Sequence, residues 1–218
     1  MLVQEIRTKN VLTTTAGTTA PDALALMREK NVRRLPVLDK AGTLVGIVSD
    51  KDLLYASPSP ATSLSIFEIN ALLSKIFVSH VMTSKVVTIT EDLAVEDAAR
   101  IMADKKIGGI PVMKDAKLIG IVTETDLFRA LLQLLGGRRS GVRVTVRTPG
   151  AKGTFTKVTG IISAAGGDIV GLGVVEALGV PGDYWNMTLK VQDLSKKAVS
   201  AAFSKAGIEV VDIRESKE

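Results

Sequence analysis

The chain has 218 residues, of which 46% are hydrophobic and 23% charged, a composition that is ordinary for a globular protein of one or two domains. It contains no cysteine and a single histidine, His80, which excludes disulfides and thiolate metal sites and argues against a histidine-based metal cluster or catalytic dyad. The net charge is +5, but aromatic residues make up only 4% and basic residues are interspersed with acidic ones, which favours small anions over a nucleic-acid duplex.

No apolar run approaches the roughly 20 residues that a membrane-spanning helix needs. The N-terminus, MLVQEIRTKN, also lacks the basic-then-apolar order of a signal peptide. We therefore expect a cytoplasmic protein with no membrane partner.

The first part of the chain contains an internal repeat. The segment RRLPVLDKAGTLVGIVSDKDLL (33–54) aligns with GGIPVMKDAKLIGIVTETDLF (108–128). Their prolines, Pro36 and Pro111, lie 75 positions apart, and several residue pairs outside the aligned segments keep the same offset. Such a register indicates a duplicated structural unit.

Each copy predicts the order β-α-β-β-α. A short strand rich in Thr and Val leads to a helix, whose start in the first copy is marked by Thr19, Pro21 and Asp22. Two short, almost wholly apolar strands follow, as is typical of a sheet covered by helices. The second helix of each copy begins near Asp50 or Glu124.

The segment between the copies starts as a Pro/Ser-rich loop, after which Ser65 and Glu68 predict the beginning of an amphipathic helix. We expect the first copy to span 1–60, the connecting helix 61–78 and the second copy 79–135.

A glycine pair and a basic linker, residues 136–140, precede a segment of different character, residues 141–218. Its opening VRVTVR alternates as a strand with one exposed face, and the elements that follow predict the ferredoxin-like order β-α-β-β-α-β. The expected fold class is therefore α/β (α+β), with a tandem pair of β-α-β-β-α units and a ferredoxin-like C-terminal domain.

Both copies end in the same pattern, GIVSDKD and GIVTETD. The glycine allows close approach of a ligand to the strand, and the hydroxyl of Ser49 or Thr123 lies where the strand meets a helix N-terminus, which suits a phosphate. One turn later, Asp52 or Asp126 can accept hydrogen bonds from both hydroxyls of a ribose. The same spacing is also that of a plain N-cap, and a single copy would more often be structural.

This duplicated unit resembles a tandem CBS-domain pair, or Bateman module. The resemblance implies that an adenosine-containing ligand such as AMP, ATP, NAD or S-adenosylmethionine binds in clefts between the copies. It also implies apolar walls for the adenine and threonines that contact the base or ribose. These further candidates are Thr13, Thr88, Leu35, Pro36, Ile110 and Pro111.

The two copies differ in charge near the motif. Arg33 and Arg34 precede the proline strand of the first copy and Lys51 lies in its motif, whereas the second copy has the glycine pair 108–109 before its proline strand and Glu124-Thr125 in its motif. Arginine and lysine attract a phosphate and glutamate repels it, so we expect the two clefts to be inequivalent. Solvated surface charge is the alternative for each of these residues.

Within residues 141–218, AKGTFTKVTGIISAAGGDIVGL resembles an ACT domain, a regulatory module that often binds amino acids at a dimer interface. The resemblance implies effector-binding roles for Gly153, Asp168 and Ile169. Gly150 stands where the family commonly has an acidic residue, so dimerisation without an amino acid is the alternative. A CBS pair followed by an ACT domain is similar to the acetoin-utilisation CBS–ACT proteins.

The combined expectation is a non-enzymatic regulator that binds an adenine nucleotide, forms a homodimer and acts on a target protein, with neither a metal nor a catalytic cofactor. One alternative is a nucleic-acid-binding regulator, motivated by Arg138, Arg139, Arg143 and Arg147. The other is a nucleotide hydrolase, for which the sequence offers no positioned base, nucleophile or metal cluster.

Overall fold

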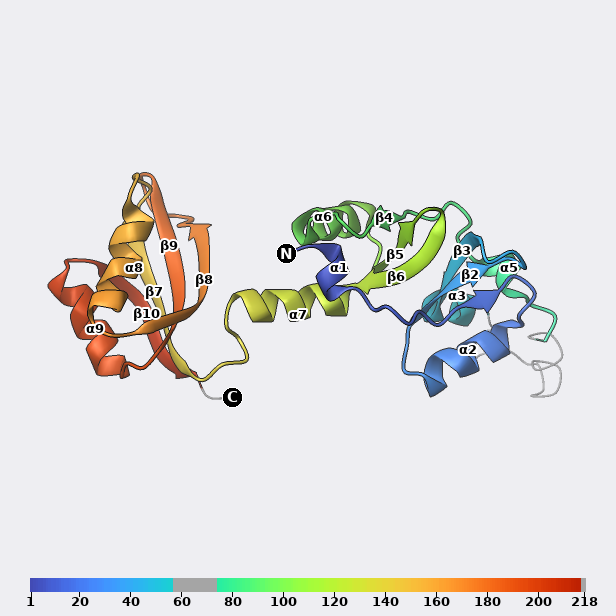
Figure 1. The fold of residues 1–218 in the computed structure, drawn as a ribbon, viewed down its shortest axis with the longest axis horizontal. Coiled ribbons are helices and arrows are strands. Elements are labelled where there is room, and N and C mark those ends of the chain that lie inside the picture. Colours follow the sequence, from blue (N-terminus) through green and yellow to red (C-terminus); the bar gives the residue numbers. More distant parts are fainter. Residues whose placement is uncertain (57–73, 217–218) are drawn as a thin grey trace. The chain divides into compact units, whose positions relative to one another are not determined.

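The computed structural model describes residues 1–56 and 74–216, which form two compact units, Met1–Leu127 and Phe128–Glu218 (Figure 1). The helix expected to begin at Ser65 lies outside the described residues. The elements of the first unit are α1 (Val3–Ile6), β1 (Thr14–Thr15), α2 (Ala20–Glu29), β2 (Arg34–Leu38), β3 (Leu44–Ser49), α3 (Asp50–Tyr55), α5 (Val78–Val81), β4 (Ile89–Thr90), α6 (Val95–Lys105), β5 (Gly109–Lys114), β6 (Lys117–Thr123) and the start of α7 (Glu124–Leu134). Those of the second unit, after the end of α7, are β7 (Gly141–Pro149), α8 (Thr154–Ala164), β8 (Asp168–Glu176), β9 (Tyr184–Gln192), α9 (Lys196–Lys205) and β10 (Glu209–Ser216).

The first unit contains two three-stranded sheets with the orders β1-β2-β3 and β4-β5-β6, which confirms the predicted β-α-β-β-α order of each copy. In both sheets the first strand pairs parallel to the second and a hairpin adds the third antiparallel. The registers also match, since Arg34 lies opposite Ser49 and Gly109 opposite Thr123. The duplication therefore holds at the level of single residues.

Helix α2 begins as its sequence predicts. The Thr19 side chain accepts a hydrogen bond from the Asp22 amide and donates one to Asp22 Oδ2, at 2.6 Å, and a proline occupies the first turn. The helix then buries its apolar stripe, with Ala23 and Met27 2% exposed or less.

Each copy is completed by the segment that precedes the other copy in sequence. Val3 of α1 is fully buried in the core of the second copy, and Val78 of α5 is fully buried in the core of the first. The exchanged segments each form one bridge to the edge of a sheet, Thr8 with Ile121 and Thr83 with Ile47. Neither one-turn helix has a helical period long enough to be recognised in the sequence.

The crossing of these segments explains the glycine in each repeated motif. A Cβ on Gly120 would lie 2.7 Å from Arg7 Cδ and 3.1 Å from the Thr8 carbonyl oxygen, and a Cβ on Gly46 would meet Met82 and Thr83 in the same way. The glycines thus make room for the exchanged segments, whereas the sequence had favoured close approach of a ligand.

Arg7 is held firmly at this crossing. Its Nη1 donates to the Ile119 carbonyl at 2.8 Å, and its Nη2 pairs with Glu91 at 3.0 Å. Lys114 contacts the other oxygen of Glu91 at 2.7 Å, and the hydrogen bonds from Lys114 and Arg7 hold the pKa of Glu91 below its ordinary value. Arg7 therefore cannot move aside freely to admit a side chain at position 120.

The second unit has the ferredoxin-like arrangement predicted from its element order. Its antiparallel sheet has the strand order β10-β7-β9-β8, and α8 and α9 cover one face of it (Figure 1). The core lies between helices and sheet and consists of Val142, Val144, Val146, Val158, Ile162, Met187, Leu189, Val191, Val199 and Phe203. Residues of β7 and β9 that alternate with these lie on the opposite face of the sheet.

We predict that Gly120→Ala lowers the free energy of unfolding by about 1–3 kcal/mol, because the added methyl group overpacks the crossing of the exchanged segment. Gly17→Ala is the matched control, since a Cβ there has no atom within 4 Å. Urea unfolding followed by circular dichroism measures both. Equal unfolding midpoints for the two variants would contradict the proposed role of Gly120.

Candidate functional site

The repeated hydroxyl and carboxylate form the same hydrogen-bonded arrangement twice. In the first copy the Ser49 amide and hydroxyl both donate to Asp52 Oδ2, at 2.8 and 2.7 Å, and the Asp52 amide donates back to Ser49 Oγ at 3.3 Å. In the second copy the Thr123 amide and hydroxyl donate to Asp126 Oδ2, at 2.9 and 2.7 Å. The two carboxylates are thus fixed at the first turns of α3 and α7.

The three-residue spacing of hydroxyl and carboxylate thus forms the expected capping interaction, in which Oδ2 of each aspartate accepts the hydrogen bonds. Within the described part of the chain, Oδ1 of Asp52 accepts no hydrogen bond. Asp52 is half-buried and Asp126 is only 7% exposed. Asp52 is thus a capped, oriented carboxylate with its second oxygen available, which is well suited to accept hydroxyl groups of a ligand.

The apolar candidates have two different environments. Leu35 and Ile110 are completely buried in the cores of their own copies, so neither presents a free surface to an adenine ring. Pro36 and Pro111 are also buried, but the alternation of a strand places them on the opposite face from Leu35 and Ile110.

The threonine candidates directly precede the first strand of each sheet. Thr13 is half-buried and precedes Thr14, whose partner on β2 is Val37. Thr88 is exposed and precedes Ile89, which pairs with Val112 in the corresponding way. Each threonine thus lies near the proline of the neighbouring strand, and the two positions correspond.

Arg34 extends from the first copy onto the second. A Cβ on Gly108 would lie 2.7 Å from Arg34 Cζ and 2.8 Å from Glu124 Oε2, and a Cβ on Gly109 would lie 3.2 Å from Arg34 Cδ. The guanidinium of Arg34 and the carboxylate of Glu124 therefore both lie where a side chain on Gly108 would stand, close to each other, whereas Lys51 is an exposed residue of α3.

The role of the glycine pair at 108–109 was not predicted from the sequence. These residues occupy the positions of Arg33 and Arg34 in the second copy, and they leave the space that the Arg34 side chain fills. The exchange of two arginines for two glycines at matched positions was the available signal.

Comparison with known proteins agrees with the duplicated fold. The family model described as the CBS domain matches residues 3–59 and 78–133, more than half of the chain. The chain belongs to the CBS-domain family. Its two copies are a tandem CBS pair.

Solved CBS proteins resemble this pair along almost their whole length. The AMP complex of CBSX2, a protein of Arabidopsis thaliana, is 35% identical with a TM-score of 0.52, over 61% of this chain and 97% of that chain. A CBS pair crystallised with 5′-methylthioadenosine and S-adenosyl-L-methionine is 29% identical with a TM-score of 0.51, over 64% and 98%. A Vibrio cholerae protein described as the acetoin utilization protein AcuB is 28% identical with a TM-score of 0.52, over 63% and 95%.

Outside the CBS pair, the residues implied by the ACT resemblance are placed by turns of the C-terminal unit. Gly153 caps α8 with a φ of 86°, Asp168 is exposed at the start of β8, and Ile169 packs against the core. The carboxylate of Asp183 lies against Gly150, where a side chain at that position would stand, and its Oδ1 accepts a hydrogen bond from Trp185 Nε1 at 2.9 Å. An acidic group is therefore present beside Gly150, supplied by a different strand connection.

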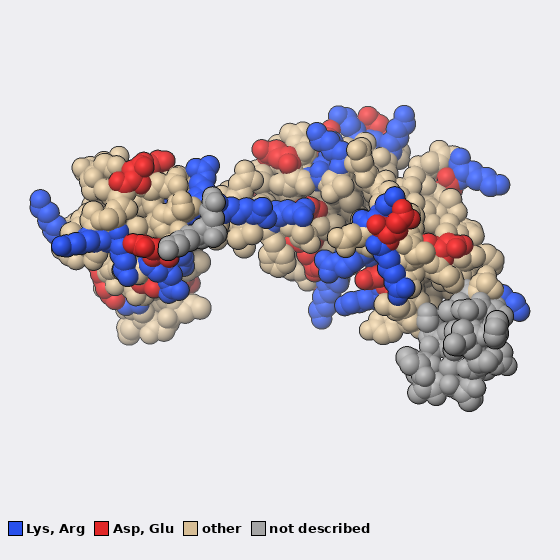
Figure 2. Space-filling view, turned by 90° about the horizontal axis from the view of Figure 1, so that it is seen from below, with Lys and Arg blue, Asp and Glu red and all other residues tan. Residues whose placement is uncertain are grey.

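The arginines that motivated a nucleic-acid interface are partly neutralised. Arg143 pairs with Asp212 and Arg147 with Glu209, both at 2.9 Å. On the face shown in Figure 2, acidic residues lie among the lysines and arginines of each unit.

Among the described residues, no helix is long and apolar enough to cross a membrane, and no group of three potential metal ligands is found.

Proposed function

We propose that this protein is a regulatory, non-enzymatic CBS protein that binds an adenosine-containing nucleotide beside Asp52 and Asp126. The observation that carries the proposal is the identical, capped geometry of these two carboxylates in both copies. The bound AMP, 5′-methylthioadenosine and S-adenosyl-L-methionine of the similar CBS structures support an adenosine ligand and leave its substituent at the 5′ position open.

The chemistry of recognition follows from the capped carboxylates. Oδ2 of each aspartate is committed to the Ser49 or Thr123 cap, which fixes the orientation of the group. The other oxygen accepts the ribose hydroxyls, and each charge-assisted hydrogen bond contributes about 1.5–3 kcal/mol. Thr13 and Thr88, which directly precede the first strand of each sheet, and the two buried prolines are proposed to contact the base.

We predict that the double variant Asp52→Asn/Asp126→Asn weakens AMP binding at least tenfold, because an amide is a poorer acceptor for a ribose hydroxyl than a carboxylate. The amide oxygen of an asparagine can still accept the hydrogen bonds from Ser49 and Thr123, so the fold is expected to survive. Isothermal titration calorimetry measures the affinity.

Asp22→Asn is the matched control for this experiment. Asp22 forms the same kind of capping interaction with Thr19 but lies in the first turn of a different helix, α2. Its variant is expected to bind AMP as the unaltered protein does. Unchanged affinity in the double variant would refute nucleotide recognition by these carboxylates.

Arg34 is proposed to attract the phosphate end of the nucleotide, with Lys51 as a weaker, exposed contributor. A unit charge about 4 Å from a phosphate is worth roughly 4 kcal/mol at an effective dielectric constant of 20, before desolvation is subtracted. The carboxylate of Glu124, which lies beside the same guanidinium at Gly108, offsets part of this attraction. The preference for AMP over adenosine therefore depends on Arg34.

We predict that Arg34→Met reduces the AMP-to-adenosine affinity ratio about fivefold, since a quarter of that interaction, about 1 kcal/mol, corresponds to a factor of about five. Arg33→Met is the control, because Arg33 is an exposed neighbour of the same charge. Titrations with both ligands give the ratio. An equal ratio in the two variants would mean that Arg34 is a solvated bystander.

The C-terminal unit is proposed to be an ACT-like module, an assignment that its ferredoxin-like strand order supports. An acidic side chain, Asp183, lies beside Gly150 and is suited to the ammonium group of an amino acid. A thermal-shift panel of amino acids tests this, and no stabilisation by any of them would leave dimerisation as the role of the module. Acetoin utilisation and a target protein stay predictions based on resemblance, and a cytoplasmic location stays a prediction from the sequence.

We predict that the full chain is a homodimer, because Phe128, Leu131, Leu132 and Leu134 of α7 are 41–64% exposed and two copies of such a face complete a closed interface. Sedimentation velocity at micromolar concentration measures the mass, and Leu131→Lys is expected to shift it toward the monomer. A monomer in the unaltered protein, with and without AMP, would contradict the prediction.

A further inference from the structure

Lys190 is an unusual lysine of the C-terminal unit. It lies on β9 between the core residues Leu189 and Val191, so it faces away from the helices, yet it is only 4% exposed. A lysine on the outer face of a sheet normally extends its ammonium group into water. Burial, and then the like charge of Arg143, lower the pKa of Lys190.

No described residue forms a hydrogen bond or ion pair with the ammonium group of Lys190. Arg143 is its Cα partner on β7 and carries the same charge. The nearby carboxylate of Asp212 is already shared between Arg143, at 2.9 Å, and Arg214, at 2.6 Å. Buried charges are ordinarily paired, but the described residues supply no counter-ion for Lys190.

The chain that follows α7 covers Lys190. A Cβ on Gly136 would lie 3.2 and 3.3 Å from Lys190 Cγ and Cβ, and 3.0 Å from the Val170 carbonyl oxygen. Position 171 is also a glycine, and a Cβ on Gly171 would lie 2.6 Å from the Gly136 amide nitrogen. The contact between this segment and the sheet is therefore backbone against backbone, and it shields the lysine stem from water.

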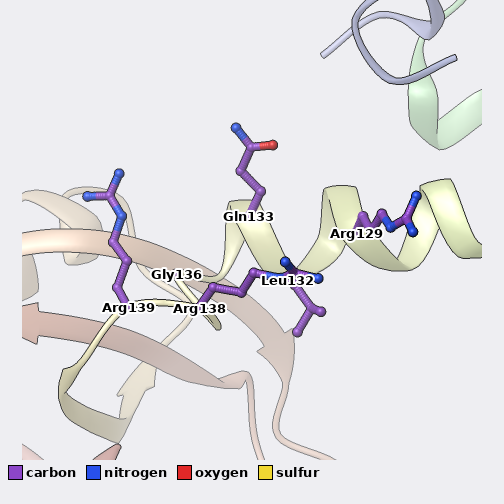
Figure 3. Close-up of a pocket in the computed structure, with 6 residues that line it drawn as sticks. All are labelled: Arg129, Leu132, Gln133, Gly136, Arg138 and Arg139. Atoms are coloured by element: carbon purple, nitrogen blue, oxygen red, sulfur yellow. The ribbon is translucent and has the colours of Figure 1, made fainter. Parts of the chain in front are cut away.

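Gly136 also lines a pocket of about 280 Å³ (Figure 3). The other residues that line it are Arg129, Leu132, Gln133, Arg138 and Arg139. In Figure 3 the Arg138 side chain extends toward Leu132 at the last turns of α7, whereas Arg139 points away from that turn. None of the residues that line the pocket is acidic. Gly136, which forms part of its wall, is also the residue that packs on Lys190.

We propose that this pocket, with Lys190 behind Gly136 and Arg138 at its rim, binds a compact oxyanion, the phosphate or carboxylate group of a small molecule. A site of this size excludes a nucleic-acid duplex but accommodates a small anion. Arg138 supplies an exposed, planar donor group, and the charge of Lys190, which does not itself line the pocket, adds to the attraction from behind Gly136. The site lies wholly in the C-terminal unit and is independent of the proposed nucleotide site.

The test uses the full chain labelled with ¹⁵N-glycine and titrated at constant ionic strength with inorganic pyrophosphate in one arm and succinate in the other. The amide signals of Gly136, Gly137 and Gly171 report on the proposed site, and those of Gly108 and Gly109 report on the CBS pair. We expect saturable shifts of the first group with at least one of the two anions, and the stronger arm identifies phosphate or carboxylate as the preferred group.

Lys190→Met keeps the length of the stem and removes the charge, and it is expected to weaken this binding at least tenfold. Arg138→Met changes only an exposed side chain, so it folds even if the first variant does not, and it is expected to weaken binding severalfold. Lys157→Met, an exposed lysine of α8, is the control for general charge and is expected to leave the affinity unchanged.

Shifts confined to Gly108 and Gly109 would overturn the proposal, because the anion would then bind only to the CBS pair. Equal losses of affinity in the Lys157 and Arg138 variants would also overturn it, since they would reveal attraction by net charge. Absence of any saturable shift with both anions would do the same.

Discussion

The exchange of N-terminal segments between the two CBS copies is the constraint on which the first unit depends. A single β-α-β-β-α unit leaves an apolar surface uncovered, and here Val3 closes the core of the second copy while Val78 closes that of the first. Full burial of a valine contributes about 1.5–3 kcal/mol, and both exchanged segments add backbone bridges to a sheet edge. Neither copy can therefore be complete without the chain that leads into the other, and the two copies fold as one unit.

This exchange also determines what can stand between the copies. Gly46 and Gly120 leave room for the crossing segments, and the glycine pair at 108–109 leaves room for Arg34 to reach across from the first copy. The repeat is consequently symmetric in its backbone and asymmetric in its charges. Two equivalent carboxylates, each capped in the same way, face surroundings that differ by an arginine on one copy and a glycine pair on the other. This difference is the physical basis for the inequivalence that we propose for the two nucleotide sites.

Much of this organisation could be predicted from the sequence because it has a local cause. The Thr19–Asp22 cap and the alternation in β7 each depend on a few neighbouring residues, and the repeat is visible as a constant offset between matching residues such as Pro36 and Pro111. The structure contains the elements that these patterns predict. The same is true of the C-terminal strand order, since the order β-α-β-β-α-β has few compact solutions. The hydrogen bonds of Asp52 and Asp126 with the hydroxyl three residues earlier follow from a local spacing that recurs, whereas their role in ligand binding stays a prediction.

The features that were not predicted arise from contacts between distant parts of the chain. The glycine of each motif was assigned to a ligand because nothing near it in sequence shows that Thr8 or Thr83 crosses there. Leu35 and Ile110 were placed along the ligand because an apolar strand residue does not reveal which face of its sheet is the core. The burial of Lys190 depends on a segment more than fifty residues earlier, and no local pattern could indicate it.

The most direct test of the central claim is a crystal structure of the full chain with AMP, because it shows where the ribose lies. Our account predicts that the ribose hydroxyls of a bound nucleotide lie within hydrogen-bonding distance of Asp52 or Asp126 while Oδ2 of that aspartate keeps its Ser49 or Thr123 cap. A nucleotide bound away from both carboxylates would contradict it, and the two capping motifs would then have a structural role alone.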